Sequence, residues 1–369
     1  MYFQRVIILC GLLPLFAMAE AGETIKWGGD FRAGYYGSET DRRDGTQSSK
    51  RSGRARIRYG FNAAINEKWS SQLRFAGHYS TDQTSTGFSF VPYNNSRSFG
   101  QSTFDIAQVR YQTQKLDIRF GRMQTKFELE GVAKKSLDRN DSPNMDIDFT
   151  DGIAVTRKGT SGWDSHFILQ NNPAQGSTNV TRGPLDFTVS GTSPTVFVAL
   201  EKKDKTGPWR QRGIDLTYIP NSLLYDGTNR SDYIGLVGRA ARQWPLAGGS
   251  KFLLGMEAGY APTTPQKSAL GLGGTERAGG LAWQTTFNWL GFAPRQSIGL
   301  VLGETQGGWL LSPDFPNNRR LIEVRHRYQF NKKMRLESRI RNRVELEQKT
   351  TAVRKQDGSD FYVRFTWKL

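Results

Sequence analysis

The chain has 369 residues, of which 51 are Lys or Arg and 34 are Asp or Glu, so its net charge is +17. The mean hydropathy is −0.58, and no segment after the N-terminal region approaches roughly eighteen consecutive apolar residues, which excludes a transmembrane helix there. In a soluble protein, this much positive charge would point to nucleic acid as a partner.

The first 19 residues have the features of an export signal. Arg5 provides a positive charge, residues 6–16 form an apolar stretch, and Ala17-Met18-Ala19 is a small-residue cleavage site before Glu20. We expect cleavage after Ala19, leaving residues 20–369 as a single domain without a cysteine. Export argues against nucleic acid as a partner, and the absence of disulfides means that hydrogen-bonded structure must stabilise the chain.

Beyond this signal, apolar and polar side chains alternate with a period of two, which predicts β-strands. In residues 319–330, Ile322 and Val324 share one parity, and Glu323 and Arg325 share the other. The alternation returns after a polar turn at residues 331–333, so the two segments form a hairpin. The pattern divides the chain into 16 candidate strands: 24–36, 54–66, 69–79, 103–113, 116–121, 151–158, 163–170, 195–201, 210–219, 232–242, 251–260, 281–290, 296–304, 319–330, 334–346 and 360–369. A parity slip at Ile106-Ala107 predicts a β-bulge.

The strand pattern predicts an all-β fold, a transmembrane antiparallel β-barrel of about 16 strands. Only alternate residues of a spanning strand meet lipid, so a polar chain can cross a membrane in this form. Long connections (37–53, 80–101, 122–150, 171–194, 305–318 and 347–359) alternate with short ones (67–68, 114–115, 159–162 and 331–333). Outer-membrane barrels have long external loops and short periplasmic turns, whereas a soluble sandwich has no reason to alternate.

The last segment carries a resemblance to a known family. Phe361, Val363, Phe365 and Trp367 alternate with polar residues, and the chain ends at Leu369. This resembles the outer-membrane porins of Gram-negative bacteria, which end in an alternating aromatic strand that is recognised during assembly. Their usual final residue is Phe, so Leu369 makes the signal less typical. The resemblance covers the chain after the signal as architecture. It implies an outer-membrane location, contact with lipid, passive diffusion of small hydrophilic solutes, and a homotrimer without a cofactor.

In 16-stranded porins the loop after the fifth strand folds into the lumen and narrows it, and the matching segment here is the longest connection, 122–150. The family's acidic loop motif is not evident, so its constriction residues cannot be transferred. The alternative is an external loop of mixed charge. The candidate constriction residues are Lys126, Glu128, Glu130, Lys134, Lys135 and Arg139.

Basic residues gather on the inward parity of the first and last strands, which become neighbours when a barrel closes. The candidate pore-lining residues are Lys26, Arg32, Arg54, Arg56, Arg58, Arg74, Arg119, Arg325, Arg327, Arg335, Arg339, Arg341, Arg343 and Arg364. If Phe330 pairs with Met334, Arg325 faces Arg339, a costly pair unless water or an anion screens it. These rows predict an anion-preferring lumen for small anionic or polar solutes. The open alternatives are a specific channel for phosphate or acidic sugars, and a solvated basic surface.

The same register places polar His326, Ser338 and Asn342 on the outward face, where polar groups are costly against lipid. We expect them at a subunit interface, with a rim position at the water level as the alternative. They also suggest an outer-membrane phospholipase, but that family is a smaller barrel with His and Ser two apart on one strand, a spacing absent here, so we expect no enzyme. Three scattered histidines provide no metal site. A plugged structural or adhesive barrel and a secreted basic binding protein are the alternatives from other classes.

Overall fold

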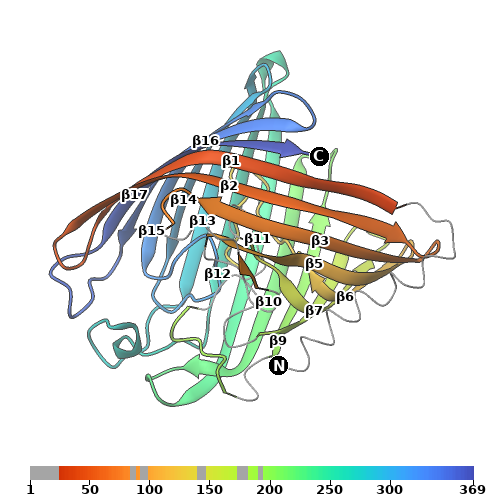
Figure 1. Ribbon diagram of the computed structural model, residues 1–369. Coiled ribbons are helices and arrows are strands. Elements are labelled where there is room, and N and C mark those ends of the chain that lie inside the picture. Colours follow the sequence, from red (N-terminus) through yellow and green to blue (C-terminus); the bar gives the residue numbers. More distant parts are fainter. Residues whose placement is uncertain (1–24, 84–88, 92–98, 139–146, 173–181, 190–193) are drawn as a thin grey trace.

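The computed structural model describes residues 25–83, 89–91, 99–138, 147–172, 182–189 and 194–369. One antiparallel sheet closes into a barrel (Figure 1). Its strands are β1 (Ile25–Asp41), β2 (Gln47–Ala64), β3 (Trp69–Ser80), β5 (Gln101–Gln112), β6 (Leu116–Met123), β7 (Thr150–Lys158), β8 (Asp164–Asn171), β9 (Pro194–Lys203), β10 (Trp209–Leu224), β11 (Arg230–Pro245), β12 (Lys251–Tyr260), β13 (Leu281–Ala293), β14 (Gln296–Thr305), β15 (Arg319–Gln329), β16 (Met334–Glu345) and β17 (Asp357–Lys368). The short β4 (Ser89–Phe90) pairs parallel to β5, and the 3-10 turns are η2 (Ala247–Gly249) and η3 (Ser268–Leu270). Among the described residues, no helix is long and apolar enough to cross a membrane.

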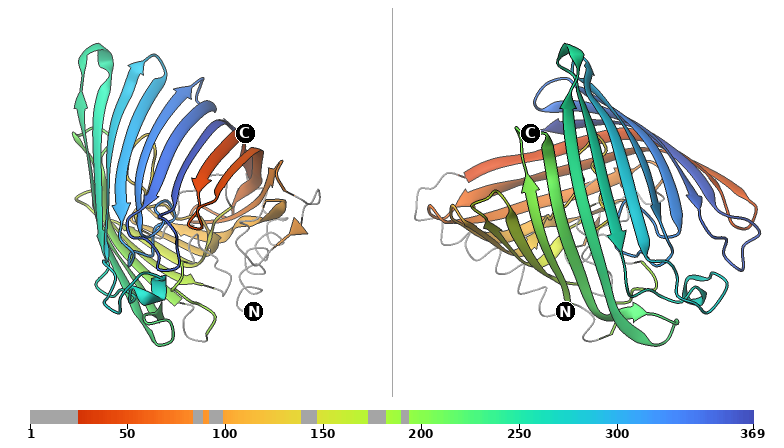
Figure 2. Two further views of the ribbon diagram at one scale, coloured as in Figure 1. Left: turned by 90° about the vertical axis from the view of Figure 1, so that its left-hand side faces the viewer. Right: turned by 180° about the vertical axis from the view of Figure 1, so that it is seen from behind.

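The barrel closes between its first and last strands. Phe31 of β1 lies opposite Ile57 of β2 on one side and opposite Trp367 of β17 on the other. Figure 2 shows the red and blue ends of the chain side by side. The 16 barrel strands match the predicted number, and the expected neighbourhood of the first and last strands is confirmed.

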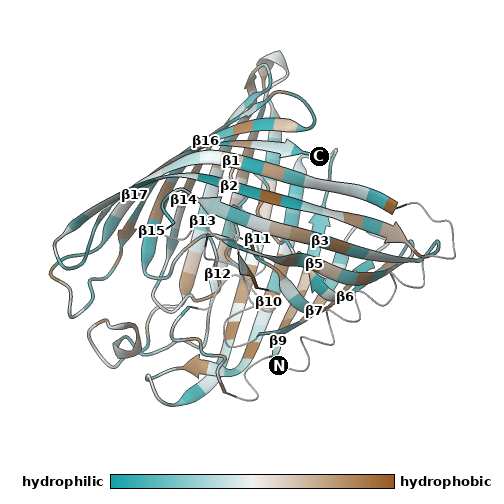
Figure 3. Cartoon of the chain, in the orientation of Figure 1, coloured by the Kyte–Doolittle hydropathy of each residue, from teal (hydrophilic) through white to brown (hydrophobic). Residues whose placement is uncertain are grey.

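The two faces of the wall differ as the alternation predicts. Outward side chains such as Trp27 and Ile340 are 61% and 69% exposed, whereas inward Arg56 is 1% exposed. Brown and teal therefore alternate along single strands in Figure 3. An apolar outer face with a polar interior is the arrangement of a lipid-embedded barrel. Closure of the sheet also leaves no strand edge with unpaired backbone groups in the bilayer.

Two finer predictions about the strands are also confirmed. Arg325 pairs with Arg339, as expected from the hairpin register. In β5 the register changes from Arg74↔Ile106 to Phe75↔Phe104, which leaves Asp105 as the extra residue of a bulge. The Asp105 carboxylate accepts two hydrogen bonds from Arg74, at 2.9 and 2.8 Å, so the bulge places a negative charge inside the barrel.

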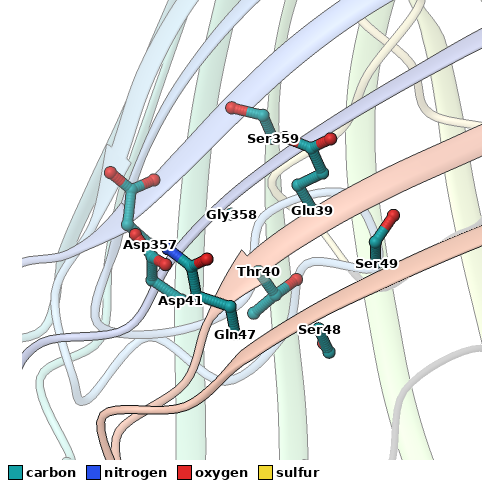
Figure 4. A pocket seen from close by; sticks show the side chains of 9 residues that line it. All are labelled: Glu39, Thr40, Asp41, Gln47, Ser48, Ser49, Asp357, Gly358 and Ser359. Carbon is teal, nitrogen blue, oxygen red and sulfur yellow. The ribbon is translucent and has the colours of Figure 1, made fainter.

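The predicted long loop at 37–53 is wrong. β1 continues to Asp41 and β2 begins at Gln47, so only a tight turn connects them. Pairing of β2 with β3 stops at Arg54↔Ser80, and the tip of the hairpin therefore extends beyond its neighbour. Both faces of this tip are polar, so its residues lack the alternation of apolar and polar side chains by which the other strand segments were predicted. Its outer face carries the hollow of Figure 4, lined by Glu39, Thr40, Asp41, Gln47, Ser48, Ser49, Asp357, Gly358 and Ser359.

The largest apolar core lies where connecting segments pack inside one side of the barrel. Residues 182–189 supply Leu185 and Phe187, and residues 306–318 supply Trp309, Leu311 and Phe315, all of them buried. The wall is shaped to receive these side chains. A Cβ on Gly259 would lie 2.6 Å from the Trp309 ring, and one on Gly303 would lie 2.5 Å from Phe315, so only glycine allows this approach.

Candidate functional site

The segment between β6 and β7 follows the fifth barrel strand and lies inside the barrel, as predicted. Its backbone N–H groups donate to side chains of three strands. Glu130 donates to Gln211 of β10 at 2.7 Å, Val132 to Asn288 of β13 at 2.7 Å, and Leu137 to Glu257 of β12 at 3.0 Å. Arg325 of β15 donates to the carbonyl of Ala133 at 2.9 Å. We call the described parts of this segment, 124–138 and 147–149, the inner loop.

The inner loop buries its apolar side chains and leaves four of the predicted constriction residues accessible. Phe127, Leu129 and Val132 are buried against the wall. Lys126 and Lys134 are exposed, and Glu128 and Glu130 are half-buried. The loop therefore presents charges of both signs to the interior. Arg139 lies outside the described residues.

Lys135 does not present its charge to the lumen, which corrects the sequence prediction. Its side chain is 1% exposed, and its Nζ lies 3.0 Å from Glu323 and 3.5 Å from Asp314. Burial lowers the pKa of Lys135, while these carboxylates oppose the shift. Lys135 is thus an anchor between the inner loop and the wall, a role that sequence spacing does not reveal.

Arg239 of β11 fixes both ends of the loop's apolar stretch. Its Nη1 donates to the carbonyl of Phe127 at 2.8 Å, and its guanidinium contacts Asp138 at 2.6 Å, Asp215, and Glu257 at 3.1 Å. All four charged groups are buried. A single guanidinium thus holds three carboxylates from the loop and from two strands, so the loop's position depends on it.

Residues 306–318 form a second inserted segment, which was not predicted from the sequence because this connection was expected to be external. Trp309 donates through Nε1 to the carbonyl of Leu137 at 3.1 Å, and Ser312 donates to the carbonyl of Ser136 at 2.6 Å. The apolar run Trp309-Leu310-Leu311 in an otherwise polar connection was the available signal. The segment holds the inner loop against β10 to β15.

Gly299 of β14 provides a test of this packing. A Cβ there would lie 2.9 Å from the Cβ of Val132 and 2.8 Å from the Asn288 amide oxygen. We expect Gly299→Val to push the inner loop towards the lumen and to lower the single-channel conductance, with an overpacking cost of about 1–3 kcal/mol. Gly238→Val is the control, because nothing lies within 4 Å of a Cβ there. Equal conductance of the two variants would contradict the assigned loop position.

The inward faces of β15, β16, β17 and β1 to β3, with the bulge of β5, form what we call the basic wall. Its arginines are Arg32, Arg54, Arg56, Arg58, Arg74, Arg319, Arg325, Arg327, Arg335, Arg339, Arg341, Arg343 and Arg364, and its carboxylates are Asp30, Asp105, Glu323, Glu337, Glu345 and Asp360. Thirteen guanidinium groups therefore share six carboxylates. The wall retains a positive charge after all its internal pairing.

Single carboxylates of the basic wall each serve several arginines. Glu337 lies within 3.7 Å of four guanidinium groups, those of Arg325, Arg327, Arg335 and Arg364. Asp360 contacts Arg339, Arg341 at 2.8 Å and Arg343 at 3.3 Å. Asp30 lies 2.6 Å from Arg58, 2.8 Å from Arg56 and 3.7 Å from Arg32. Each cluster is therefore positive as a unit.

Protein groups surround the like-charged pair Arg325 and Arg339. Arg325 donates to Glu323 at 2.6 Å, and Arg339 bonds to Asp360. The ring of Tyr362 lies 5.9 Å from the Arg325 guanidinium carbon and 4.3 Å from that of Arg339. Carboxylates and an aromatic face thus reduce the repulsion.

This architecture recurs in solved structures. OprB of Pseudomonas putida, in its high-pH structure, covers 96% of this chain and 96% of its own length, with a TM-score of 0.61 at 10% identity. OpdQ of Pseudomonas aeruginosa covers 94% of this chain and 97% of its own, with a TM-score of 0.59 at 10% identity. The anion-selective porin of Comamonas acidovorans covers 94% and 100%, with a TM-score of 0.54 at 10% identity. No protein-family model and no curated protein sequence matches the chain.

The chain has the fold of an outer-membrane porin. Coverage of nearly the whole length on both sides means that the porin fold accounts for the complete barrel. At 10% identity the likeness concerns architecture, so the chemistry of the interior depends on this chain's own residues.

The remaining predicted residues take diverse places in this porin fold. Lys26 is exposed near the start of β1, and Arg119 donates to the carbonyl of Gln124, where the inner loop leaves the wall. Outward His326 pairs across the hairpin with Ser338, and its Nε2 lies 2.9 Å from the Gln296 amide oxygen.

The outward residue Asn342 donates to Asp357 at 2.8 Å. His326 lies on β15, and Ser338 and Asn342 lie on β16. His326 and Asn342 already have polar partners within the chain.

Proposed function

We propose that this protein is an outer-membrane porin that allows passive diffusion of small hydrophilic solutes and prefers anions. The observation that carries the proposal is the excess of guanidinium groups over carboxylates on the basic wall. Arg335, Arg341 and Arg343 keep 26%, 13% and 33% of their side chains accessible, so their donors can meet a solute. The described hydrogen bonds between the inner loop and β10, β12, β13 and β15 involve side chains other than these three arginines.

The mechanism is passive. Water fills the lumen, the inner loop limits the size of the solute, and rows of positive charge raise the local concentration of anions. Lys126 and Lys134 on the loop would add to this field, and Glu128 and Glu130 would reduce it. The anion-selective porin of Comamonas acidovorans, which shares the fold, supports the proposal by analogy.

A substrate-specific channel for phosphate or acidic sugars is the second candidate. The observation that favours it is a hollow on the basic wall, lined by Tyr36, Gly37, Ser38, Lys50, Ser52, Arg54, Arg339, Arg341, Arg343, Asp360 and Phe361. Several guanidinium donors that converge on one hollow suit a carboxylate or phosphate. One solved structure with this fold, OccK2 of Pseudomonas aeruginosa, is in complex with glucuronate.

The packed interior favours a third candidate, a plugged structural barrel. Three segments meet in the apolar core and occupy one side of the interior. Our proposal further includes export with cleavage after Ala19, residence in the outer membrane in contact with lipid, and a homotrimer whose interface includes His326, Ser338 and Asn342.

Liposome swelling with a matched pair of sugars tests the proposal. Glucuronate and glucose have similar sizes and differ in charge, so an anion-preferring pore should admit glucuronate faster. We expect the swelling rate with glucuronate to exceed that with glucose, and the difference to shrink as salt screens the wall. Faster entry of glucose would contradict the anion preference, and no swelling with either sugar would favour the plugged barrel.

A further inference from the structure

A row of alternating tryptophan and arginine side chains crosses the outward face of the barrel at its short-turn end. The guanidinium carbon of Arg212 lies 5.7 Å from the ring centroid of Trp163 and 6.0 Å from that of Trp209. That of Arg242 lies 5.4 Å from Trp209 and 5.1 Å from Trp244. In outer-membrane barrels the short-turn end faces the periplasm, so this row lies at the edge of the inner leaflet.

Both arginines point outward. Arg212 shares its parity with Ile214, which is 56% exposed, and the neighbouring inward residue Gln211 is fully buried. Arg242 lies opposite outward Trp209 and two residues before Trp244. They are therefore separate from the basic wall, whose arginines lie inside the barrel.

These two arginines have no carboxylate partner among the residues that the structure describes, whereas most arginines of the basic wall have one. The Nε of Arg212 is buried without a hydrogen-bond partner there. The nearby turn carries Asp204, but its carboxylate accepts N–H bonds from Gly207 at 3.0 Å and Thr206 at 2.8 Å, which lower its pKa to about 2. Two guanidinium groups are thus left on a lipid-facing surface without an internal counter-charge.

An apolar groove continues from the row. Trp244 belongs to both, and its ring lies 5.8 Å from that of Phe252. The groove is lined by Trp244, Leu246, Phe252, Phe287, Trp289, Ile298, Gly299, Leu300 and Val324. The arginines at the interface suit the headgroup of a lipid, and the apolar groove beside them suits its acyl chains.

We propose that this surface binds one anionic phospholipid of the inner leaflet, with its phosphate between Arg212 and Arg242 and an acyl chain in the groove. A guanidinium facing lipid is costly unless it reaches an anion or water. Tryptophans at the interface hold the arginines on their faces and orient them towards the headgroup. A zwitterionic lipid offers the same chains without the net negative charge, so it should bind more weakly.

Native mass spectrometry of the full-length protein with phosphatidylglycerol or phosphatidylcholine tests this site. We expect the wild type to retain phosphatidylglycerol preferentially, and Arg212→Gln with Arg242→Gln to weaken that binding by about tenfold or more. Arg277→Gln, an exposed arginine in a long connection, is the matched control and should leave binding unchanged. Arg212→Lys with Arg242→Lys should preserve most of the affinity, because the charge remains.

Single-channel conductance equal to that of the wild type would show that each variant is folded, since these residues lie outside the lumen. Equal retention of the two lipids by the wild type would overturn the proposal. So would a double glutamine variant that binds phosphatidylglycerol as the wild type does. Loss of affinity in the Arg277→Gln control as well would indicate a general charge effect and would also overturn it.

Discussion

Replacing Arg335, Arg341 and Arg343 together by glutamine should lower the chloride-to-potassium permeability ratio about tenfold. These are accessible donors of the basic wall, and each shares its carboxylate with other arginines. Glu337 keeps Arg325 and Arg364 as partners, so the clusters remain paired after the change. The measurement is the zero-current potential of the variant and the wild type under the same KCl gradient.

The control for this variant is Arg320→Gln. Arg320 lies on the outward parity of β15, its side chain is 63% exposed, and it pairs with Glu304 at 3.0 Å. Arg320→Gln therefore removes one guanidinium charge outside the lumen, and the ion selectivity should not change. Arg325 and Arg339 are poorer targets, because both are buried and Arg325 also holds the inner loop. An unchanged ratio in the triple variant would show that the basic wall does not set selectivity.

Arg239→Ala should detach the inner loop and destabilise the barrel. The substitution removes the bond to the carbonyl of Phe127 and leaves Asp138, Asp215 and Glu257 buried without their cation. Breaking a buried ion pair by removing one partner costs about 3–5 kcal/mol. We expect the heat-modifiable conversion on a gel to occur at a lower temperature, and single-channel currents to fluctuate more.

Arg210→Ala is the matched control on the neighbouring strand. Arg210 also contacts the inner loop, through Glu130 at 3.3 Å, but this pair is partly exposed and should contribute less than about 1 kcal/mol. Arg239→Lys keeps the positive charge and should recover part of the stability. If Arg239→Ala behaved like Arg210→Ala, the loop would not depend on the buried cluster.

The lipid-embedded part of the fold could be predicted from the sequence because water and lipid impose opposite demands on alternate residues. This rule gave the 16 strands, the pairing of Arg325 with Arg339 and the bulge near Ile106. It fails where the strands leave the bilayer. The tip of β1 and β2 has water on both faces, so its polar residues gave no strand signal.

The site was less predictable, because the inserted segments depend on tertiary contacts. Arg239 lies in a strand that is apolar on both parities, with Tyr233 and Val237 among its inward neighbours, and its carboxylate partners come from distant segments. Lys135 was expected to present its charge to the lumen, and Trp309 belongs to a connection that was expected outside the barrel. Gly259 makes room for the Trp309 ring, but a glycine in a strand does not by itself show that residues 306–318 pack inside the barrel.

The most direct test of the account is the zero-current potential of the purified wild-type protein in a planar bilayer under a KCl gradient. The excess of arginine on the basic wall predicts a potential shifted towards the equilibrium potential of chloride. A shift towards that of potassium would contradict the anion preference and would mean that the carboxylates of the inner loop dominate the lumen.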